Sequence, residues 1–396
     1  MATVSKAFVT PEMLRWARER VGMPLDLFAS KLNIAEDTLL EWEEGASQPT
    51  FKQAEKFAKV AKIPFGYLFL DQPPIERVTL PDFRTTGSPG SKKPLGADFE
   101  DVLNDVLYKQ DWFKEYRQSI GLVKLDFVGS QSKEDGPEEI ATSIRRALGT
   151  TIDHYRSFRQ VDAYLADLVA RCEQAGIWIF KNSVVKNNNT RKLNVQEFRG
   201  FAISDPIAPV VFINASDAKT AQIFTLIHEL AHIWLGITGV SDPQQFDVRA
   251  RSNEAKIERL CNQVAECFLT PKKQFRKLWD HDVSTEKNLL NLAKEFKVSR
   301  AVVAFSSVNY RLIQKENVNF VFRNIKKYWE DDTQKPKSGS GDYYRTLKAR
   351  VGKTFFYSVI SSAASGGLLI REAGTLLNAS PKVVGEAYRR HKDGVL

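Results

Sequence analysis

Residues 223–235 read Ile-Phe-Thr-Leu-Ile-His-Glu-Leu-Ala-His-Ile-Trp-Leu, and they decide the fold in the middle of this 396-residue chain. Neither glycine nor proline occurs in this run, which predicts one apolar helix. On that helix His228 and His232 are four residues apart, so the two imidazoles lie on the same face. Such a pair binds one zinc ion in the H-E-x-x-H pattern, in which Glu229 lies close enough to hold a metal-bound water.

An alternative explanation is a buried helix whose two histidines form hydrogen bonds within the core. The chain has five histidines in all, and two of them fall here at ligand spacing. Burying two imidazoles and a carboxylate on an otherwise apolar helix costs free energy unless a metal or a polar partner is present. We therefore expect a zinc site with His228 and His232 as ligands and Glu229 as the catalytic residue.

Residues 254–269 supply the candidates for a third ligand. Their apolar side chains recur with i, i+3, i+4 spacing, which predicts a second amphipathic helix that ends at Pro271. Glu258 lies beside this apolar stripe, where a carboxylate needs a strong partner such as a zinc ion. We prefer Glu258 as the third ligand, followed by Glu254 and then Glu266, although each of the latter two could be an ordinary solvated carboxylate.

These two segments, residues 200–236 and 257–271, resemble the ImmA/IrrE family of metallopeptidases. The resemblance lies in the HELAH motif, in a glutamate placed shortly before Cys-Asn, and in the closing sequence Phe-Leu-Thr-Pro. It implies that His228, His232 and Glu258 are the zinc ligands and that Glu229 is the catalytic residue. It also implies a substrate class, namely a helix-turn-helix repressor whose cleavage releases stress-response, phage or mobile-element genes.

Residues 11–70 contain five short amphipathic helical patterns, with a tight turn at Asn33-Ile34, and resemble a Xre/Cro-type helix-turn-helix. The expected recognition helix, residues 35–44, has no lysine or arginine. Its carboxylates are Glu36, Asp37, Glu41, Glu43 and Glu44. Because a DNA-reading helix approaches a polyanion, we expect this domain to bind protein rather than DNA.

The positive charge of the chain, +9 overall, is concentrated at its C-terminal end. Residues 1–75 hold 9 Lys/Arg and 10 Asp/Glu, whereas residues 343–396 hold 9 Lys/Arg and 3 Asp/Glu. We expect one helix over residues 344–364 and a two-helix turn over residues 369–388. This basic region could make weak nucleic-acid contacts, dock a protein or pack in an oligomer.

The expected fold class is α+β and mostly helical. The expected domains are a helix-turn-helix domain at 1–75, a linker at 76–100, a zincin-like peptidase domain with a small sheet at 101–325, a flexible linker at 326–342 and a basic helical domain at 343–396. No apolar run is long enough to span a membrane, and no signal peptide is evident. Three cysteines without metal-site spacing favour a reducing, cytoplasmic location.

Residues 210–214 are expected to form a strand, with residues 200–204 as a neighbour, and an edge strand of this kind can pair with an extended substrate. Tyr310 is a weak candidate for stabilising the oxyanion, and core packing is its more ordinary role. The sequence predicts a zinc-dependent site-specific endopeptidase. The alternatives are a DNA-binding regulator, or a toxin–antitoxin or defence interaction protein, with a structural or vestigial zinc site.

Overall fold

The computed structural model describes residues 5–74, 96–241, 252–313 and 342–392. The chain divides into two compact units, of which the first comprises Met1–Val78 with Lys93–Asn104 and the second Thr79–Lys92 with Asp105–Leu396. Much of the expected linker 76–100, and all but the last residue of the expected linker 326–342, lie outside the described residues.

The first unit is helical, as the sequence predicts. Its elements are α1 (Pro11–Arg20), α2 (Leu25–Leu32), α3 (Glu36–Glu43), α4 (Phe51–Val60), the 3₁₀ turn η1 (Phe65–Phe69) and the start of α5 (Ala97–Ser119). Helix α2 ends where Asn33 takes the left-handed conformation, and a capping box between Thr50 and Gln53 starts α4. Phe28 and Phe57 meet in the core with ring centroids 4.9 Å apart.

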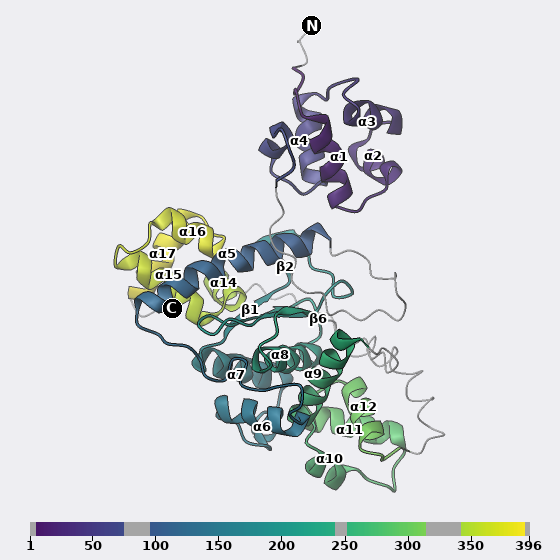
Figure 1. Cartoon of the computed structure of the whole chain (residues 1–396), viewed down its shortest axis with the longest axis vertical. Coiled ribbons are helices and arrows are strands. Elements are labelled where there is room, and N and C mark those ends of the chain that lie inside the picture. The colour runs from purple at the N-terminus through teal and green to yellow at the C-terminus, as the bar shows by residue number, and fades with distance from the viewer. Residues whose placement is uncertain (1–4, 75–95, 242–251, 314–341, 393–396) are drawn as a thin grey trace. The chain divides into compact units, whose positions relative to one another are not determined.

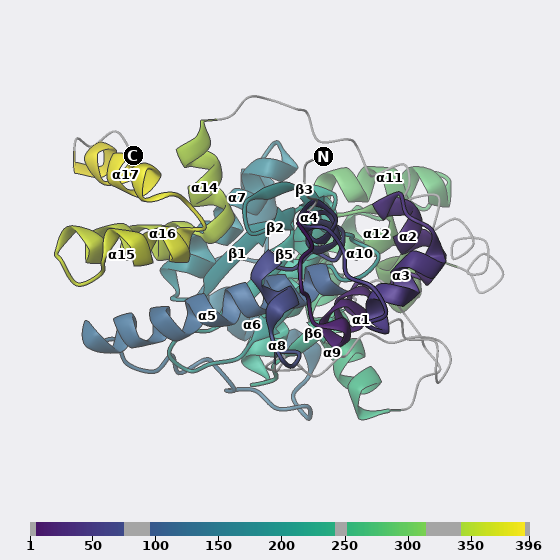
Figure 2. The same cartoon turned by 90° about the horizontal axis from the view of Figure 1, so that it is seen from above.

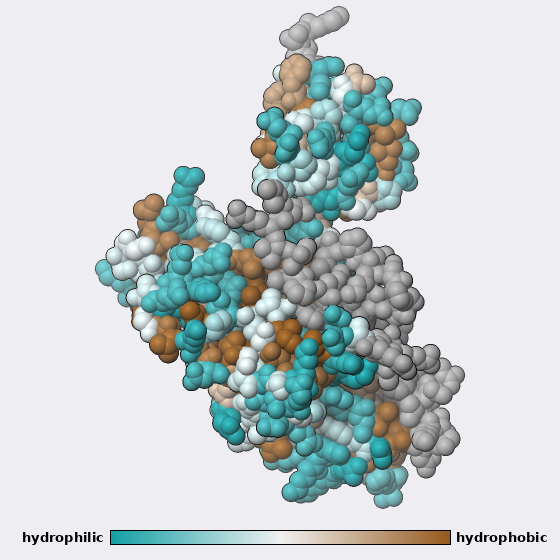
Figure 3. Space-filling model, in the orientation of Figure 1, coloured by the Kyte–Doolittle hydropathy of each residue, from teal (hydrophilic) through white to brown (hydrophobic). Residues whose placement is uncertain are grey.

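The acidic helix α3 presents fewer carboxylates to solvent than its sequence suggests. Glu43 is buried, and the Arg18 guanidinium donates to its two carboxylate oxygens at 2.6 and 2.8 Å. Because Glu43 lies one turn after the buried Leu39, it shares the face of α3 that packs on α1. The expectation of five repelling carboxylates is therefore wrong for this residue, and four remain exposed: Glu36, Asp37, Glu41 and Glu44. Hydrophilic residues dominate the visible face of this unit, with separate apolar patches (Figure 3).

The second unit is built on a four-stranded mixed sheet with the order β1-β5-β4-β6. The strands are β1 (Trp178–Asn182), β5 (Val210–Asn214), β4 (Gly200–Ile203) and β6 (Gly239–Ser241). Strand β1 is parallel to β5, and β4 is antiparallel to both β5 and β6. A separate hairpin joins β2 (Val184–Val185) and β3 (Asn188–Lys192). The strands expected at 210–214 and 200–204 are confirmed as neighbours.

Neither of these two strands lies at an edge of the sheet, so that part of the sequence interpretation is wrong. Strand β1, about 30 residues earlier in the chain, pairs along β5, and β6 follows the motif helix to pair along β4. Both partners are distant in sequence, and β6 is only three residues long. The two ends of the described sheet are therefore β1 and β6.

Helices cover both faces of this sheet (Figure 1). On one face lie α6 (Pro137–Ala147), α7 (Val161–Gln174), α8 (Lys219–Trp234) and α9 (Asn253–Leu269). On the other face, Phe113 and Lys109 of α5 contact the rings of Trp178 and Phe180. The helices α10 (Lys272–Leu278), α11 (Thr285–Phe296) and α12 (Arg300–Asn309) and the turn η2 (His154–Ser157) extend the core beyond α9. No described helix has both the length and the apolarity needed to cross a membrane.

The C-terminal region consists of α14 (Tyr343–Val351), α15 (Lys353–Ala364), α16 (Ile370–Leu377) and α17 (Pro381–Lys392), gathered in one group (Figure 2). The two-helix turn expected at 369–388 is confirmed, but the single helix expected at 344–364 is wrong. Gly352 separates α14 from α15 because its φ of 85° is not helical, and only glycine adopts this conformation without strain. A Cβ at Gly352 would also lie 2.8 Å from the Ile179 carbonyl oxygen of β1. The Trp178 indole donates to the Val351 carbonyl at 2.6 Å, which fixes α14 beside β1.

Candidate metal centre

The motif helix α8 is buried along most of its length, as its continuous apolar sequence predicts. Every residue from Gln222 to Trp234 is buried, including His228, Glu229 and His232. The helix packs on β4 and β5 of the sheet and on helix α9. Imidazole and carboxylate groups are thus held inside the protein, where each needs a polar partner or a metal ion.

Helix α9 carries the acidic residue to this site. The Ser252 hydroxyl accepts a hydrogen bond from the Ala255 amide and caps its N-terminus, and Pro271 follows its C-terminus. Its apolar stripe joins the main core and packs against α8. Glu258 and Asn262, four residues apart, lie on the same face of α9 and reach the histidines of α8.

The side chains of His228, His232 and Glu258 converge on one point. The Nε2 atoms of the two histidines are 3.2 Å apart. Each of these nitrogens lies near one oxygen of Glu258, at 3.2 Å for His228 and 3.1 Å for His232. One ligand atom from each residue lies within 4.8 Å of the others, and all three residues are buried.

Asn262 orients His228, and the sequence interpretation did not identify it as a site residue. The Nδ1 of His228 is 2.9 Å from the Asn262 Oδ1, an acceptor, so Nδ1 carries the proton and donates. The Nε2 atom that faces Glu258 is then unprotonated and available as a ligand. The available sequence signal was the position of Asn262 one turn after Glu258, on the same helix face.

The electrostatics of this cluster favour an ionised carboxylate at Glu258. Burial by itself would raise the pKa of Glu258, but the charges of His228 and His232 and their hydrogen bonds outweigh it and lower the pKa to about 2. Burial lowers the pKa of His232, against the opposing influence of Glu258. A carboxylate and neutral imidazoles are the protonation states that bind a metal ion.

This donor set fits a zinc ion. Two imidazoles and one carboxylate are a known set of three protein ligands in catalytic zinc sites. Such histidines usually donate their other ring N–H to an oxygen of the protein, as His228 does to Asn262. The arrangement could therefore hold a metal ion on α8 and α9 through His228, His232 and Glu258.

The other acidic candidates lie apart from this cluster. Glu254 is exposed at the first turn of α9. Glu266 is buried, but its carboxylate accepts a hydrogen bond from the Asn309 amide at 2.7 Å.

Glu229 lies on α8 between the two histidines and is fully buried. Burial raises the pKa of the Cys261 thiol, and the charges of Glu258 and Glu229 raise it further.

Tyr310 belongs to the core. It ends α12, and its hydroxyl donates to the Thr270 carbonyl oxygen at 2.8 Å, while its ring meets that of Phe275. Burial raises the pKa of this hydroxyl above its usual value. The structural role given above as the ordinary one for Tyr310 therefore accounts for its contacts.

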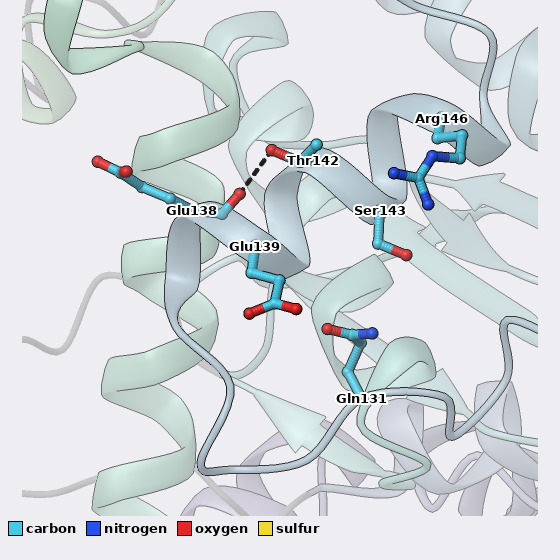
Figure 4. Close-up of a pocket in the computed structure, with 6 residues that line it drawn as sticks. All are labelled: Gln131, Glu138, Glu139, Thr142, Ser143 and Arg146. Carbon is cyan, nitrogen blue, oxygen red and sulfur yellow. Dashed lines mark hydrogen bonds between the residues drawn. The ribbon is translucent and has the colours of Figure 1, made fainter.

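A surface pocket of about 330 Å³ lies on α6, and none of the clustered residues lines it (Figure 4). Its lining comprises Gln131, Glu138, Glu139, Thr142, Ser143 and Arg146. The Ser143 hydroxyl also accepts a hydrogen bond at 3.0 Å from the indole of Trp234, at the end of α8. The pocket therefore lies beside the residue that holds the end of the motif helix, and it is separate from the metal cluster.

Comparisons with known proteins match the segment that holds this cluster. Residues 172–307 match the family described as the IrrE N-terminal-like domain, and residues 14–68 match a helix-turn-helix family. Residues 351–390 match a domain of unknown function (DUF8813). The chain is 31% identical over 119 residues to the radiation response metalloprotease IrrE of Deinococcus radiodurans, a match that covers 30% of this chain and 35% of that protein. The chain therefore carries an IrrE N-terminal-like domain and a helix-turn-helix domain.

Proposed function

We propose that this protein is a zinc-dependent, site-specific endopeptidase that cleaves a helix-turn-helix transcriptional repressor. The observation that supports it best is the convergence of His228, His232 and Glu258, with Glu229 on the same helix as the two histidines. A zinc site that only stabilises the fold has four protein ligands and no use for a buried glutamate between two of them. This difference favours hydrolysis over a structural or vestigial metal site.

In this proposal His228, His232 and Glu258 hold the zinc ion. When bound, zinc polarises the scissile carbonyl and makes water a stronger nucleophile. Asn262 keeps His228 in the tautomer that can act as a ligand. Glu229 is the general base and general acid: it accepts a proton from the attacking water and then transfers it to the leaving amine. Burial around Glu229 keeps other water away from this carboxylate.

The sheet offers a place for the substrate backbone. Strand β6 ends the described sheet on the side of β4, and β4 packs on α8. An extended peptide can add to an exposed sheet edge through main-chain hydrogen bonds. We propose that the substrate pairs with β6, which replaces the earlier expectation that residues 210–214 would serve.

Two observations support a repressor as the substrate: the resemblance to the family, and the presence of a helix-turn-helix domain and a peptidase-like domain in one chain. Members of the ImmA/IrrE family cut repressors of this kind, and the relative from Deinococcus radiodurans is named a radiation response metalloprotease. That match covers about a third of the relative, so its activity comes to this chain as part of the proposal. A role in stress response, phage or mobile-element control belongs to the same proposal, as does action in the cytoplasm, where three free cysteines stay reduced.

The two ends of the chain have different surfaces for partners. The exposed carboxylates of α3 and of its C-cap residue Glu44 favour a protein partner for the helix-turn-helix domain. Helix α17 carries Arg389, Arg390, His391 and Lys392 in its last turn, where weak contact with nucleic acid is the proposed role. Glu386 pairs with Arg389 and Arg390, which reduces the charge available for such contact. The division into three domains and two linkers, with boundaries at 75, 100, 325 and 342, also remains a proposal.

The deciding experiment is incubation of the zinc-bound full chain with the helix-turn-helix repressor encoded beside its gene. One discrete cleavage is expected, and mass spectrometry of the fragments would locate the bond. The matched control is Glu229→Gln, which keeps the side-chain shape and removes the base. An intact repressor in the wild-type reaction, or equal cleavage by both proteins, would contradict the proposal. A sequence-specific shift of duplex DNA without cleavage would instead support the DNA-binding alternative.

A further inference from the structure

Strand β4 meets the motif helix at a glycine. An ideal Cβ on Gly200 would lie 2.6 Å from Cγ2 of Thr225 and 3.0 Å from Oε1 of Glu229. It would also lie 2.9 Å from the carbonyl oxygen of Phe212 on β5. Thr225 and Glu229 are four residues apart on α8, so one row of that helix faces Gly200.

The backbone conformation does not explain this glycine. Gly200 is absent from the positive-φ residues of the described chain, and it sits in regular pairing with Ile213 of β5 and Ser241 of β6. Any residue could adopt such an extended conformation. Gly200 is buried and would place a Cβ against α8, so the missing side chain allows close approach between strand and helix.

We propose that Gly200 is a positioning residue for Glu229, because it leaves vacant the space next to the carboxylate. This inference rests on the proposed role of Glu229 as the general base. Ala202, two residues along the same strand, is also fully buried and faces the same core. At position 200, however, a single methyl group would approach closer than real Cβ atoms do, with a carboxylate oxygen among the atoms it meets.

A methyl group at position 200 would act mainly on the atoms that can move. The carbonyl of Phe212 is fixed by the sheet, whereas the carboxylate of Glu229 ends a side chain with rotatable bonds. We therefore expect Gly200→Ala to displace this carboxylate. A catalytic group misplaced by about 1 Å can cost on the order of 100-fold in rate.

The first test is kinetic and uses the full chain with the repressor that it cleaves. Gly200→Ala should retain one zinc per chain and lower kcat about 10- to 100-fold, with KM changed less than about threefold. In the Glu229→Gln background the same substitution should cause no further loss of kcat. Equal losses of kcat in both backgrounds would overturn the proposal, because Gly200 would then act without Glu229.

A matched control separates positioning from general strain. Ala202→Val adds bulk to the same face of β4 and should lower Tm with no change in kcat. Thr225→Ser removes the methyl group nearest to position 200, so adding it to Gly200→Ala should restore part of the lost Tm but not kcat. Recovery of kcat in that double variant would show that Thr225, and not Glu229, transmits the effect.

The second test needs no substrate and no metal. In the metal-free full chain, Gly200→Ala should lower Tm less when Glu229 is also replaced by alanine, because the carboxylate that the methyl group meets is gone. Equal losses of Tm in both backgrounds would overturn the contact itself. If the wild type cleaves no repressor while this coupling is present, the proposed function fails and the packing of Gly200 against Glu229 stands.

Discussion

The carboxyl group of Glu266 should make the protein less stable as the pH rises from about 5 to 8. Burial raises the pKa of this group from 4.5 to about 7, although the hydrogen bond from Asn309 acts in the opposite direction. The folded protein thus holds a proton at this position that the unfolded chain releases more readily. Glu266 lies eight residues after Glu258, on the same helix but outside the metal cluster.

The direction and size of this change in stability follow from the pKa of Glu266 in the unfolded and in the folded protein. Below pH 4.5 the carboxyl group is protonated in both states, and its contribution to stability is fully present. Between pH 4.5 and about 7 the unfolded chain ionises first, which lowers the free energy of unfolding. At about 1.4 kcal/mol per pKa unit, a difference of about 2.5 units corresponds to a loss of roughly 3 kcal/mol, with most of it complete by pH 7.

The measurement is urea unfolding of the full chain at pH 5, 6, 7 and 8, for wild type and Glu266→Gln. Glutamine still accepts from Asn309 but cannot ionise, so subtracting the two curves removes every other titrating group. The difference between the two free energies of unfolding should change by about 2.5 kcal/mol in favour of the variant from pH 5 to pH 8, because part of the loss has already occurred at pH 5. For the control Glu115→Gln, at an exposed position of α5, the difference from wild type should vary with pH by less than about 0.5 kcal/mol. A difference for Glu266→Gln that is constant from pH 5 to 8 would refute the reasoning.

Three further predictions concern the metal cluster. Elemental analysis should find one zinc per chain and none after His228→Ala or His232→Ala, and stoichiometric zinc in both variants would rule out these ligands. Glu229→Gln should remain folded and zinc-bound while cleavage falls at least ~100-fold, and near-normal cleavage would place the base elsewhere. Asn262→Ala should weaken zinc binding ~10- to 100-fold in competition with a chelating dye, because His228 loses its acceptor. Asn309→Ala, which removes a hydrogen bond to Glu266 instead, should bind zinc like the wild type.

The helices that carry the site could be predicted from sequence because their signals are local. The apolar run around His228 and the i, i+3, i+4 spacing around Glu258 can each be recognised within a single helix. Their observed bounds, Lys219–Trp234 and Asn253–Leu269, include the predicted residues except Leu235, which is the C-cap of the first helix. The preference for Glu258 also rested on local pattern, since Glu258 lies beside the apolar stripe.

Features that depend on long-range packing could not be read in this way. The place of β1 beside β5 joins strands about 30 residues apart, and no periodicity specifies such a pairing. The contact between His228 and Asn262 depends on how α8 packs on α9. Glu43 turns inward because Arg18, 25 residues earlier, provides a partner. The division at Gly352 had a local signal, a glycine inside the expected helix, but its cause lies in the neighbouring strand β1.

The position of Gly352 also bears on how this protein avoids association through its sheet. The amide of Trp178 donates toward Pro209, on the side of β5, so the carbonyl of Ile179 points to the outer edge of β1. Gly352 and α14 lie against that edge. An open edge is a template on which a second chain can add a strand, and a bulky covering element prevents this. Helix α14 and Gly352 therefore shield the outer edge of β1 from such strand addition.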